Sequence, residues 1–224
     1  QVDASVGGKL GIDFDGLKNH IGLFKDPEMV IVHPGFLRTL PENQLKSGFA
    51  EVLKHGLILD EEYWQEVSSI APSSHTNWAA IIEHSIRLKN QVVSKDHKES
   101  GLRKILNFGH TVGHAIETSR LNSDNPLLHG EAIAAGMAIE ASISNYKGLL
   151  PDDGLKQVSQ CIFKHYGKEN LPNTNEIVRL MGHDKKNTSD RIELSLIDKI
   201  GRCQFGIPTN QQEISHAIKY YEDF

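Results

Sequence analysis

Hydrophobic residues recur at helical spacing over most of this chain. The period is clearest from Leu45 to Leu59, which predicts a helix over Glu42–Ile58 that opens with the capping-box pattern Thr39-Leu40-Pro41-Glu42. The Ala132–Tyr146 segment carries too few polar residues for an exposed helix, so we expect it to run through the core. Further helices are predicted at Glu61–Ile70, Trp78–Val93, Leu106–Leu121 and Gln211–Tyr221.

Strand-like patterns are short and lie toward the two ends of the chain. Met29–His33 is a run rich in β-branched residues that Pro34 closes, which is typical of one buried strand. Arg191–Ile197 alternates apolar and polar residues and is followed by Gly201–Ile207, which predicts a β-hairpin. We therefore expect one mostly helical domain from about residue 43 onward, with a small hairpin.

Composition and charge exclude several classes of protein. The 224 residues include 24 Lys or Arg and 29 Asp or Glu, and the net charge of −5 argues against a basic nucleic-acid clamp. Neither Cys161 nor Cys203 belongs to a CxxC pair, which argues against a disulfide framework or a cysteine zinc site. With no long apolar run and no signal-type N-terminus, we expect no membrane partner and a cytoplasmic location.

Two histidines at helical spacing carry the strongest chemical signal. His110 and His114 stand four residues apart, so on a helix they share one face and could bind a metal; a pair of surface histidines is the alternative. Gly109 and Gly113 interrupt the same predicted helix at a cost of about 1 kcal/mol each. We therefore expect a neighbouring backbone or a ligand to press against it. Thr111 stands where a zincin would have glutamate, so this is not a zincin motif.

Two more residues could complete a metal site. His129 precedes the predicted core helix, whose free N–H groups favour a neutral imidazole, although an ordinary loop histidine is equally consistent. Glu51 stands among Ala50, Val52 and Leu53, and a carboxylate in such surroundings must be paired or bound to metal. One carboxylate and two histidines with an open fourth position form a catalytic zinc set.

Cationic residues are scattered along the whole chain. Each one taken singly is best explained as a solvated surface charge, but as a group they could neutralise a phosphate and a carboxylate. They are Lys9, Lys18 beside Asn19, Lys54, Lys89, Arg103 and the pair Lys185-Lys186 after Asp184.

Taken in order, several short motifs resemble those of the 3-dehydroquinate synthases, a family of sugar-phosphate cyclases. The resemblance extends over nearly the whole chain, and its strength lies in the order of the motifs rather than in any one of them. They are Asp3 with Val6-Gly7-Gly8-Lys9, Lys18-Asn19, Ala50-Glu51-Val52-Leu53-Lys54, Gly101-Leu102-Arg103, Asn107-Phe108-Gly109-His110-Thr111-Val112-Gly113-His114-Ala115-Ile116-Glu117, His129-Gly130-Glu131 and Asp184-Lys185-Lys186.

The resemblance implies a fold with an N-terminal α/β domain that binds NAD and a C-terminal helical domain, with the active site between them. Residues 1–42 would then be a remnant of the first domain, and residues 43–224 the helical domain that binds metal and substrate. We therefore expect a mostly α fold with a small β-hairpin, in a chain that lacks most of the nucleotide-binding domain. A homodimer is expected as well.

The resemblance also implies a role for each matching position. The ligands of Zn²⁺, with Co²⁺ as an alternative metal, would be Glu51, His110 and His129. The positions that contact NAD or line its site would be Lys9, Lys18, Phe36, Leu37, Arg38 and Thr39. The substrate-contacting, catalytic positions would be Asp3, Asn19, Lys54, Lys89, Arg103, Asn107, His114 and one of Lys185 and Lys186, of which we choose Lys186.

The implied reaction converts 3-deoxy-arabino-heptulosonate 7-phosphate, a phosphorylated sugar acid, to 3-dehydroquinate and phosphate in the shikimate pathway. Alternatives are a cyclase that makes another carbocycle, a metal-dependent polyol dehydrogenase, or a helical module without activity of its own. The basic Gly101-Leu102-Arg103 and Asp184-Lys185-Lys186 motifs favour an acidic phosphorylated substrate over a neutral polyol.

Overall fold

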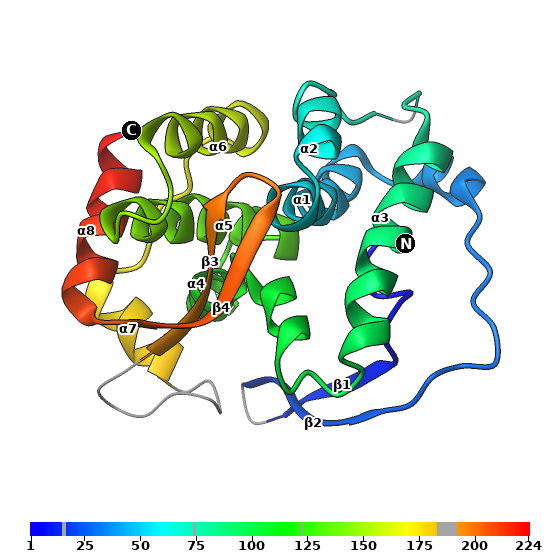
Figure 1. Cartoon of the computed structure of the whole chain (residues 1–224), viewed down its shortest axis with the longest axis horizontal. Helices are drawn as coiled ribbons and strands as arrows, with labels where there is room; N and C mark the ends of the chain where they lie inside the picture. The colour runs from blue at the N-terminus through cyan, green and yellow to red at the C-terminus, as the bar shows by residue number, and fades with distance from the viewer. Residues whose placement is uncertain (15–16, 74, 122, 183–191) are drawn as a thin grey trace.

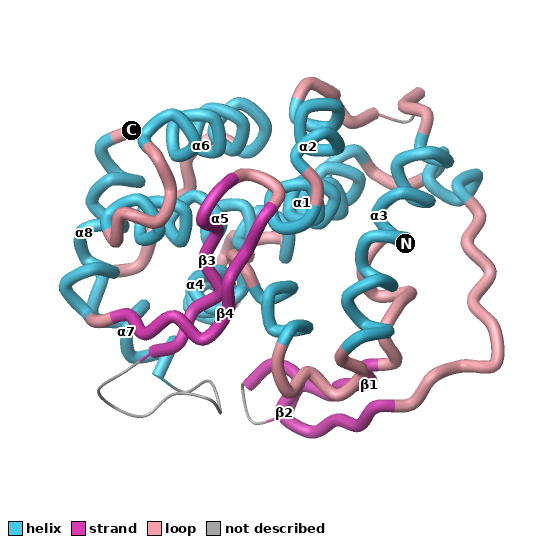
Figure 2. The backbone as a smooth tube through the Cα atoms, in the orientation of Figure 1, coloured by secondary structure: helices cyan, strands magenta, loops and turns pink. Residues whose placement is uncertain are grey.

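The computed structural model describes the chain except for residues 15–16, 74, 122 and 183–191, and it leaves the side chains of residues 13–20 undescribed. Figures 1 and 2 show a helical body with two small hairpins. The α-helices are α1 (Glu42–Leu59), α2 (Glu61–Ser68), α3 (Trp78–Lys95), α4 (His110–Arg120), α5 (His129–Tyr146), α6 (Asp152–Tyr166), α7 (Thr174–Gly182) and α8 (Gln211–Asp223). The 3₁₀ helices are η1 (Pro34–Thr39) and η2 (Leu102–Asn107). The strands are β1 (Lys9–Phe14), β2 (Leu17–Phe24), β3 (Ile192–Lys199) and β4 (Arg202–Thr209).

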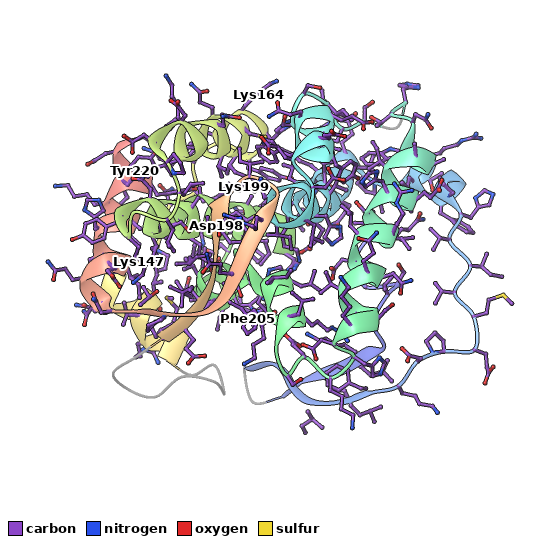
Figure 3. The ribbon with its side chains drawn as sticks, in the orientation of Figure 1. Lys147, Lys164, Asp198, Lys199, Phe205 and Tyr220 are labelled. Carbon is purple, nitrogen blue, oxygen red and sulfur yellow. The ribbon has the colours of Figure 1, made fainter. Side chains whose placement is uncertain are left out.

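Helix α5 forms the centre of the molecule, as the sequence predicts. It packs against α1, α4, α6, α8 and β3, and every residue from Ala132 to Ser144 is buried. Small side chains allow this close packing on all sides. At its C-terminal end, Lys147 ties α5 to α8 through an ion pair with Glu213, whose Oε1 lies 2.6 Å from the lysine Nζ (Figure 3).

Helix α1 confirms the predicted span but begins differently. Pro41 occupies the N-cap position, and no side chain caps the helix, so the predicted role of Thr39 in a capping box is wrong. The Pro41 carbonyl oxygen instead accepts hydrogen bonds from the N–H groups of Gln44 and Leu45, at 3.0 and 3.1 Å. The buried residues of α1 include three ionisable ones, Glu51, Lys54 and His55.

The predicted helix Leu106–Leu121 is two elements. The 3₁₀ helix η2 ends at Asn107, and α4 begins at His110, after Gly109 adopts a φ of 79° as its N-cap. That left-handed backbone is easy for glycine and costly for other residues, and it turns the chain sharply between the two helices. Gly109 is therefore a turn residue, and the expectation that it lies inside a helix is wrong.

The hairpin β3–β4 is the predicted one, with Ile192 opposite Thr209 in an antiparallel pair. A second hairpin, β1–β2, was not expected. Gly11 and Gly22 stand opposite each other in it and interrupt the β-forming pattern of both strands. Helices α6 and α7 also went unpredicted. Among the described residues, no helix is long and apolar enough to cross a membrane.

The strand predicted at Met29–His33 does not form. The segment is a loop between β2 and η1 (Figure 2), with Met29 75% and Ile31 83% exposed. A strand needs a neighbour that pairs with its N–H and C=O groups. None of the described strands pairs with this segment, so the β-branched residues stay extended and unpaired.

Candidate metal and substrate site

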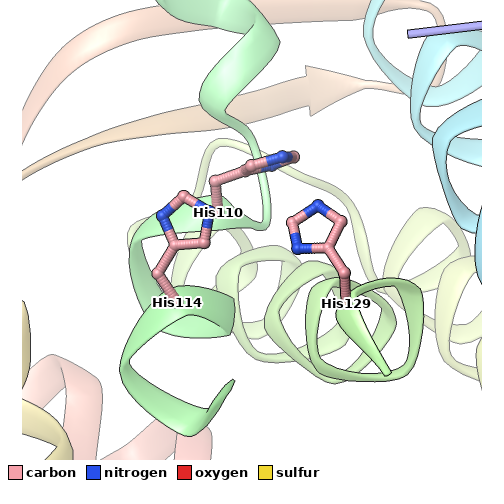
Figure 4. Close-up of side chains that lie close together, drawn as sticks. All are labelled: His110, His114 and His129. Carbon is pink, nitrogen blue, oxygen red and sulfur yellow. The ribbon is translucent and has the colours of Figure 1, made fainter. Parts of the chain in front are cut away.

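Three helices bring a carboxylate and three imidazoles together. Glu51 lies on the buried face of α1, His110 and His114 lie on the first two turns of α4, and His129 is the first residue of α5. Figure 4 shows the three rings grouped between α4 and α5. Their centroids are 5.2 to 5.8 Å apart.

The donor atoms fit a tetrahedral metal ion. Glu51 Oε1 lies 3.4 Å from Nε2 of His110 and 3.6 Å from Nε2 of His129. Bonds to zinc of about 2.0–2.2 Å place neighbouring ligand atoms of a tetrahedron roughly 3.3–3.5 Å apart. The ligand atoms of His110, His114 and His129 also lie within 4.8 Å of one another. The residues present therefore suit a metal with the nitrogen and oxygen preference of zinc.

The outer nitrogens of two of these rings have fixed partners. His110 Nδ1 lies 3.2 Å from the Phe108 carbonyl oxygen, and His129 Nδ1 lies 3.2 Å from Glu117 Oε2. Such a partner orients the ring and leaves Nε2 available as a possible metal ligand. Glu117 received no role from the sequence, although the i+3 spacing after His114 could have singled it out.

A chain of buried charges runs from Glu51 to the N-terminal segment. Lys54 Nζ lies 2.5 Å from Glu51 Oε2 and 3.8 Å from Asp3 Oδ1. Lys89, on α3, places its Nζ 2.8 Å from the same Asp3 oxygen. Lys54 is 1% and Lys89 6% exposed, so the interpretation of these lysines as solvated surface charges is wrong.

The pKa values in this chain follow from competition between burial and pairing. For Asp3, burial and the Glu51 charge act to raise the pKa, but Lys54, His55 and Lys89 outweigh them and hold it well below its usual value. Burial alone would lower the pKa of Lys54, yet Glu51 and Asp3 raise it. The pKa of Lys89 is lowered, because its burial outweighs the attraction of Asp3.

The pKa of His129 is set by competition between burial and two neighbouring carboxylates. Burial acts to lower its pKa, but the carboxylates of Glu117 and Glu51 raise it to about 9. A metal ion must displace that proton to reach Nε2, so metal binding at this set releases a proton near neutral pH.

Arg103 and Asn107 lie on η2, and both are held by other parts of the chain. Arg103 is 1% exposed and donates from Nη2 to the Gly7 carbonyl oxygen at 2.8 Å. Asn107 Nδ2 donates to Glu99 Oε1 at 2.6 Å, and Lys9 pairs with the other oxygen of Glu99. The structure therefore links Lys9 to Asn107 through Glu99, a residue that the sequence did not single out.

The predicted NAD-site residues of η1 are not gathered with these groups. In η1, Phe36 is 75% exposed, Arg38 and Thr39 are exposed, and Leu37 is half-buried. Lys18 and Asn19 lie on β2, but their side chains are outside the described part. Lys185 and Lys186 also lie outside the described residues. Their predicted contacts with NAD and substrate stay predictions.

Comparison with solved structures defines the class of this fold. A valiolone synthase of Streptomyces hygroscopicus, determined with NAD⁺ and Zn²⁺, matches 99% of the chain with a TM-score of 0.83 and 23% identity. A 2-deoxy-scyllo-inosose synthase, determined with carbaglucose 6-phosphate, NAD⁺ and Co²⁺, matches 98% with a TM-score of 0.84 and 25% identity. The chain covers 63% of each. Its fold is that of the helical part of the sugar-phosphate cyclases.

Sequence comparison identifies the family within this class of fold. Family models of the 3-dehydroquinate synthase N-terminal and C-terminal parts match residues 1–47 and 48–187. The 3-dehydroquinate synthase of Parabacteroides distasonis is 37% identical over 99% of the chain, and that of Clostridium tetani is 38% identical over 98%. The chain belongs to the 3-dehydroquinate synthase family. It spans 64% and 59% of the length of these two relatives.

Proposed function

We propose that this chain is the metal- and substrate-binding part of a 3-dehydroquinate synthase, which converts 3-deoxy-arabino-heptulosonate 7-phosphate to 3-dehydroquinate and phosphate with NAD and Zn²⁺ or Co²⁺. The observation that carries the proposal is the convergence of Glu51, His110 and His129 from three helices, with separations of 3.4 and 3.6 Å that suit a metal. The family membership and the likeness to cyclases determined with NAD⁺ support it.

A metal at this set would act as a Lewis acid that acidifies a bound hydroxyl and polarises the carbonyl formed from it. Lys54 holds Glu51 ionised by direct pairing, which keeps the carboxylate ready as a ligand. His114 lies one turn after His110, with its ring 5.2 Å away, so its imidazole can take or give a proton at a substrate oxygen beside the metal set.

The cations beyond the metal set suit a substrate that carries both a carboxylate and a phosphate. Lys89 and Lys54 approach Asp3 together, and a bound substrate could exchange with that carboxylate for the lysine N–H groups. Lys9, Asn19, Arg103 and Lys186 are proposed to stabilise the departing phosphate, and η1 with Lys18 to line the NAD site. Residues 1–42 then belong to the nucleotide side of the active site and residues 43–224 to its metal side.

The first test is the metal content of the 224-residue chain after gel filtration and loading with zinc, measured by inductively coupled plasma mass spectrometry. We expect close to one zinc per chain and its loss in His110→Ala. His84→Ala serves as the matched control, because His84 pairs with Asp60 on the α2–α3 side of the molecule. Zinc retained equally by all three proteins would overturn the metal assignment.

A second test distinguishes the proposed synthase from other sugar-phosphate cyclases. These are alternatives because the similar solved structures are a valiolone synthase and an inosose synthase. Binding of three ligands to the zinc-loaded chain is measured by calorimetry: the heptulosonate phosphate, glucose 6-phosphate and glycerol. We expect the heptulosonate phosphate to bind most tightly, because it alone supplies both a carboxylate and a phosphate to the buried cations. Preference for glucose 6-phosphate would favour an inosose-type cyclase instead.

A further inference from the structure

Glu140 is a fully buried carboxylate that joins the two helices carrying the histidines. It lies on α5, three turns after His129, and its two oxygens face the start of α4. Glu140 Oε2 accepts a hydrogen bond from the Gly109 backbone N–H at 2.6 Å, and Oε1 accepts one from the Val112 N–H at 3.1 Å. His110 stands between these two bonded amides.

Helix α4 depends on this contact because it has no local cap. Its N-cap residue is Gly109, which has no side chain to accept from the first free N–H groups. Burial raises the pKa of Glu140 to about 8, although the hydrogen bonds from the Gly109 and Val112 N–H groups act to lower it. Glu140 therefore supplies from a neighbouring helix what a serine or aspartate supplies in most helices.

The two helices are also in backbone contact at this point. A Cβ at Gly136 would lie 2.0 Å from the Gly109 carbonyl oxygen, and one at Gly113 would lie 3.0 Å from the Ala132 carbonyl oxygen. Gly136 and Glu140 are one turn apart on α5, so the glycine and the carboxyl group both contact the N-terminal end of α4. The expectation of a backbone pressed against Gly113 is confirmed.

We propose that Glu140 is a positioning residue that fixes His110 and His114 relative to His129 and so sets the geometry and affinity of the metal site. The proposal rests on the proposed metal site. His129 and Glu140 both belong to α5, and Glu140 accepts hydrogen bonds from the start of α4, the helix that carries His110 and His114. The distance between the imidazoles of the two helices is thereby held by a contact in which the imidazoles themselves take no part. Outer residues that orient metal ligands typically account for roughly 10–100-fold in affinity.

The test is the affinity of the chain for Zn²⁺ and Co²⁺, measured by competition with a chelator, and the visible absorption bands of the bound Co²⁺. In Glu140→Gln one oxygen becomes an amide that cannot accept from a backbone N–H. We expect its affinity to fall at least tenfold and its cobalt bands to shift, and Glu140→Asp, which keeps a carboxyl group as the acceptor, to lie between it and the wild type. If Glu140→Gln does not fold, the Asp variant carries the comparison.

Ile218→Ala, which truncates a buried side chain of α8, is the matched control for simple loss of stability. We expect it to melt at a lower temperature and still bind metal as the wild type does. Wild-type affinity and cobalt bands in Glu140→Gln, with metal bound through His110, would overturn the positioning role alone. Absence of metal binding in the wild type would overturn the proposed function, and the positioning role with it.

Discussion

The helical body buries its apolar side chains, whereas the N-terminal segment leaves most of its described ones exposed. In α1, Phe49, Leu53 and Leu57 are completely buried, whereas in the first hairpin Ile12 is 66% exposed, and in the loop after it Ile31 is 83% exposed. Among the described residues before Leu45, Val2 is the one buried apolar side chain. The helices bury their apolar side chains within this chain, whereas the hairpin and the loop leave most of their described ones exposed.

Charged side chains join the two regions, beside apolar contacts in which Val2 belongs to the core cluster and Val6 and Leu37 pack against it. Asp3 is held by Lys89 and Lys54, and Arg103 binds the Gly7 carbonyl oxygen. The comparison teaches that the family motifs can be present along the whole chain although the N-terminal region, unlike the helical body, leaves its apolar side chains exposed. The proposed metal side of the site is built on buried faces of helices, and the proposed nucleotide side is built on exposed residues.

The largest expected effect is at the contact between α4 and α5. Gly136→Ala places a methyl group 2.0 Å from a backbone oxygen, which no rotamer change can relieve. We expect a loss of about 3 kcal/mol or more in the free energy of unfolding, measured by urea denaturation. Gly48→Ala is the control, because nothing lies within 4 Å of its Cβ and alanine favours a helix by about 1 kcal/mol. Equal stability of the two variants would contradict this account of the helix contact.

A pair of truncations measures the contrast between the two regions directly. Leu53→Ala removes a completely buried side chain of α1 and should lower the free energy of unfolding by about 3 kcal/mol. Ile31→Ala removes one that is 83% exposed and should change it by less than about 0.5 kcal/mol. Thermal and urea unfolding of both proteins provide the measurement. A comparable loss in Ile31→Ala would show that the loop is covered in solution.

The smallest effect is expected at the edge of the helical body, where Asp60 caps α2 and contacts His84 Nε2 at 2.9 Å. Burial acts to raise its pKa, but the Tyr63 N–H and His84 outweigh this and lower it. A lowered pKa gives stability that is present above about pH 4 and is lost as the pH falls through the folded value. Asp60→Asn keeps the cap but not the charge. We expect it to be less stable than the wild type at pH 6, by under about 1 kcal/mol, and equally stable near pH 2. A constant difference would refute this reading.

The helices could be predicted because their information is local. The apolar period located α1, α3, α5 and α8 within a few residues, since each helix closes its own backbone hydrogen bonds. Met29–His33 was misread because a strand depends on a partner elsewhere. The start of α4 was misread because Gly109 could equally be a weak helix residue or a left-handed turn, and spacing does not separate the two.

The candidate site was predictable where a residue type carries its own chemistry. The histidine spacing, and the position of Glu51 among apolar neighbours, predicted a metal site. The family resemblance then indicated which residues would be its ligands. The sequence assigned no role to Glu99, Glu117 or Glu140, because the role of a glutamate depends on the residues that it contacts. Their partners here include Lys9, His129 and the Gly109 amide, which are 12 to 90 residues away in sequence. Burial of Lys54 and Arg103 was likewise a tertiary property.

The proposed metal ligands come from three separate helices, so metal binding would report whether those helices are docked. His110 and His114 come together as soon as α4 forms, whereas Glu51 and His129 reach them only when α1 and α5 have docked. In a molten state, which keeps helices but loses fixed packing, far-UV circular dichroism would stay nearly constant while the full donor set came apart. The spectrum of a bound cobalt ion would then register tertiary order that a helical signal does not report.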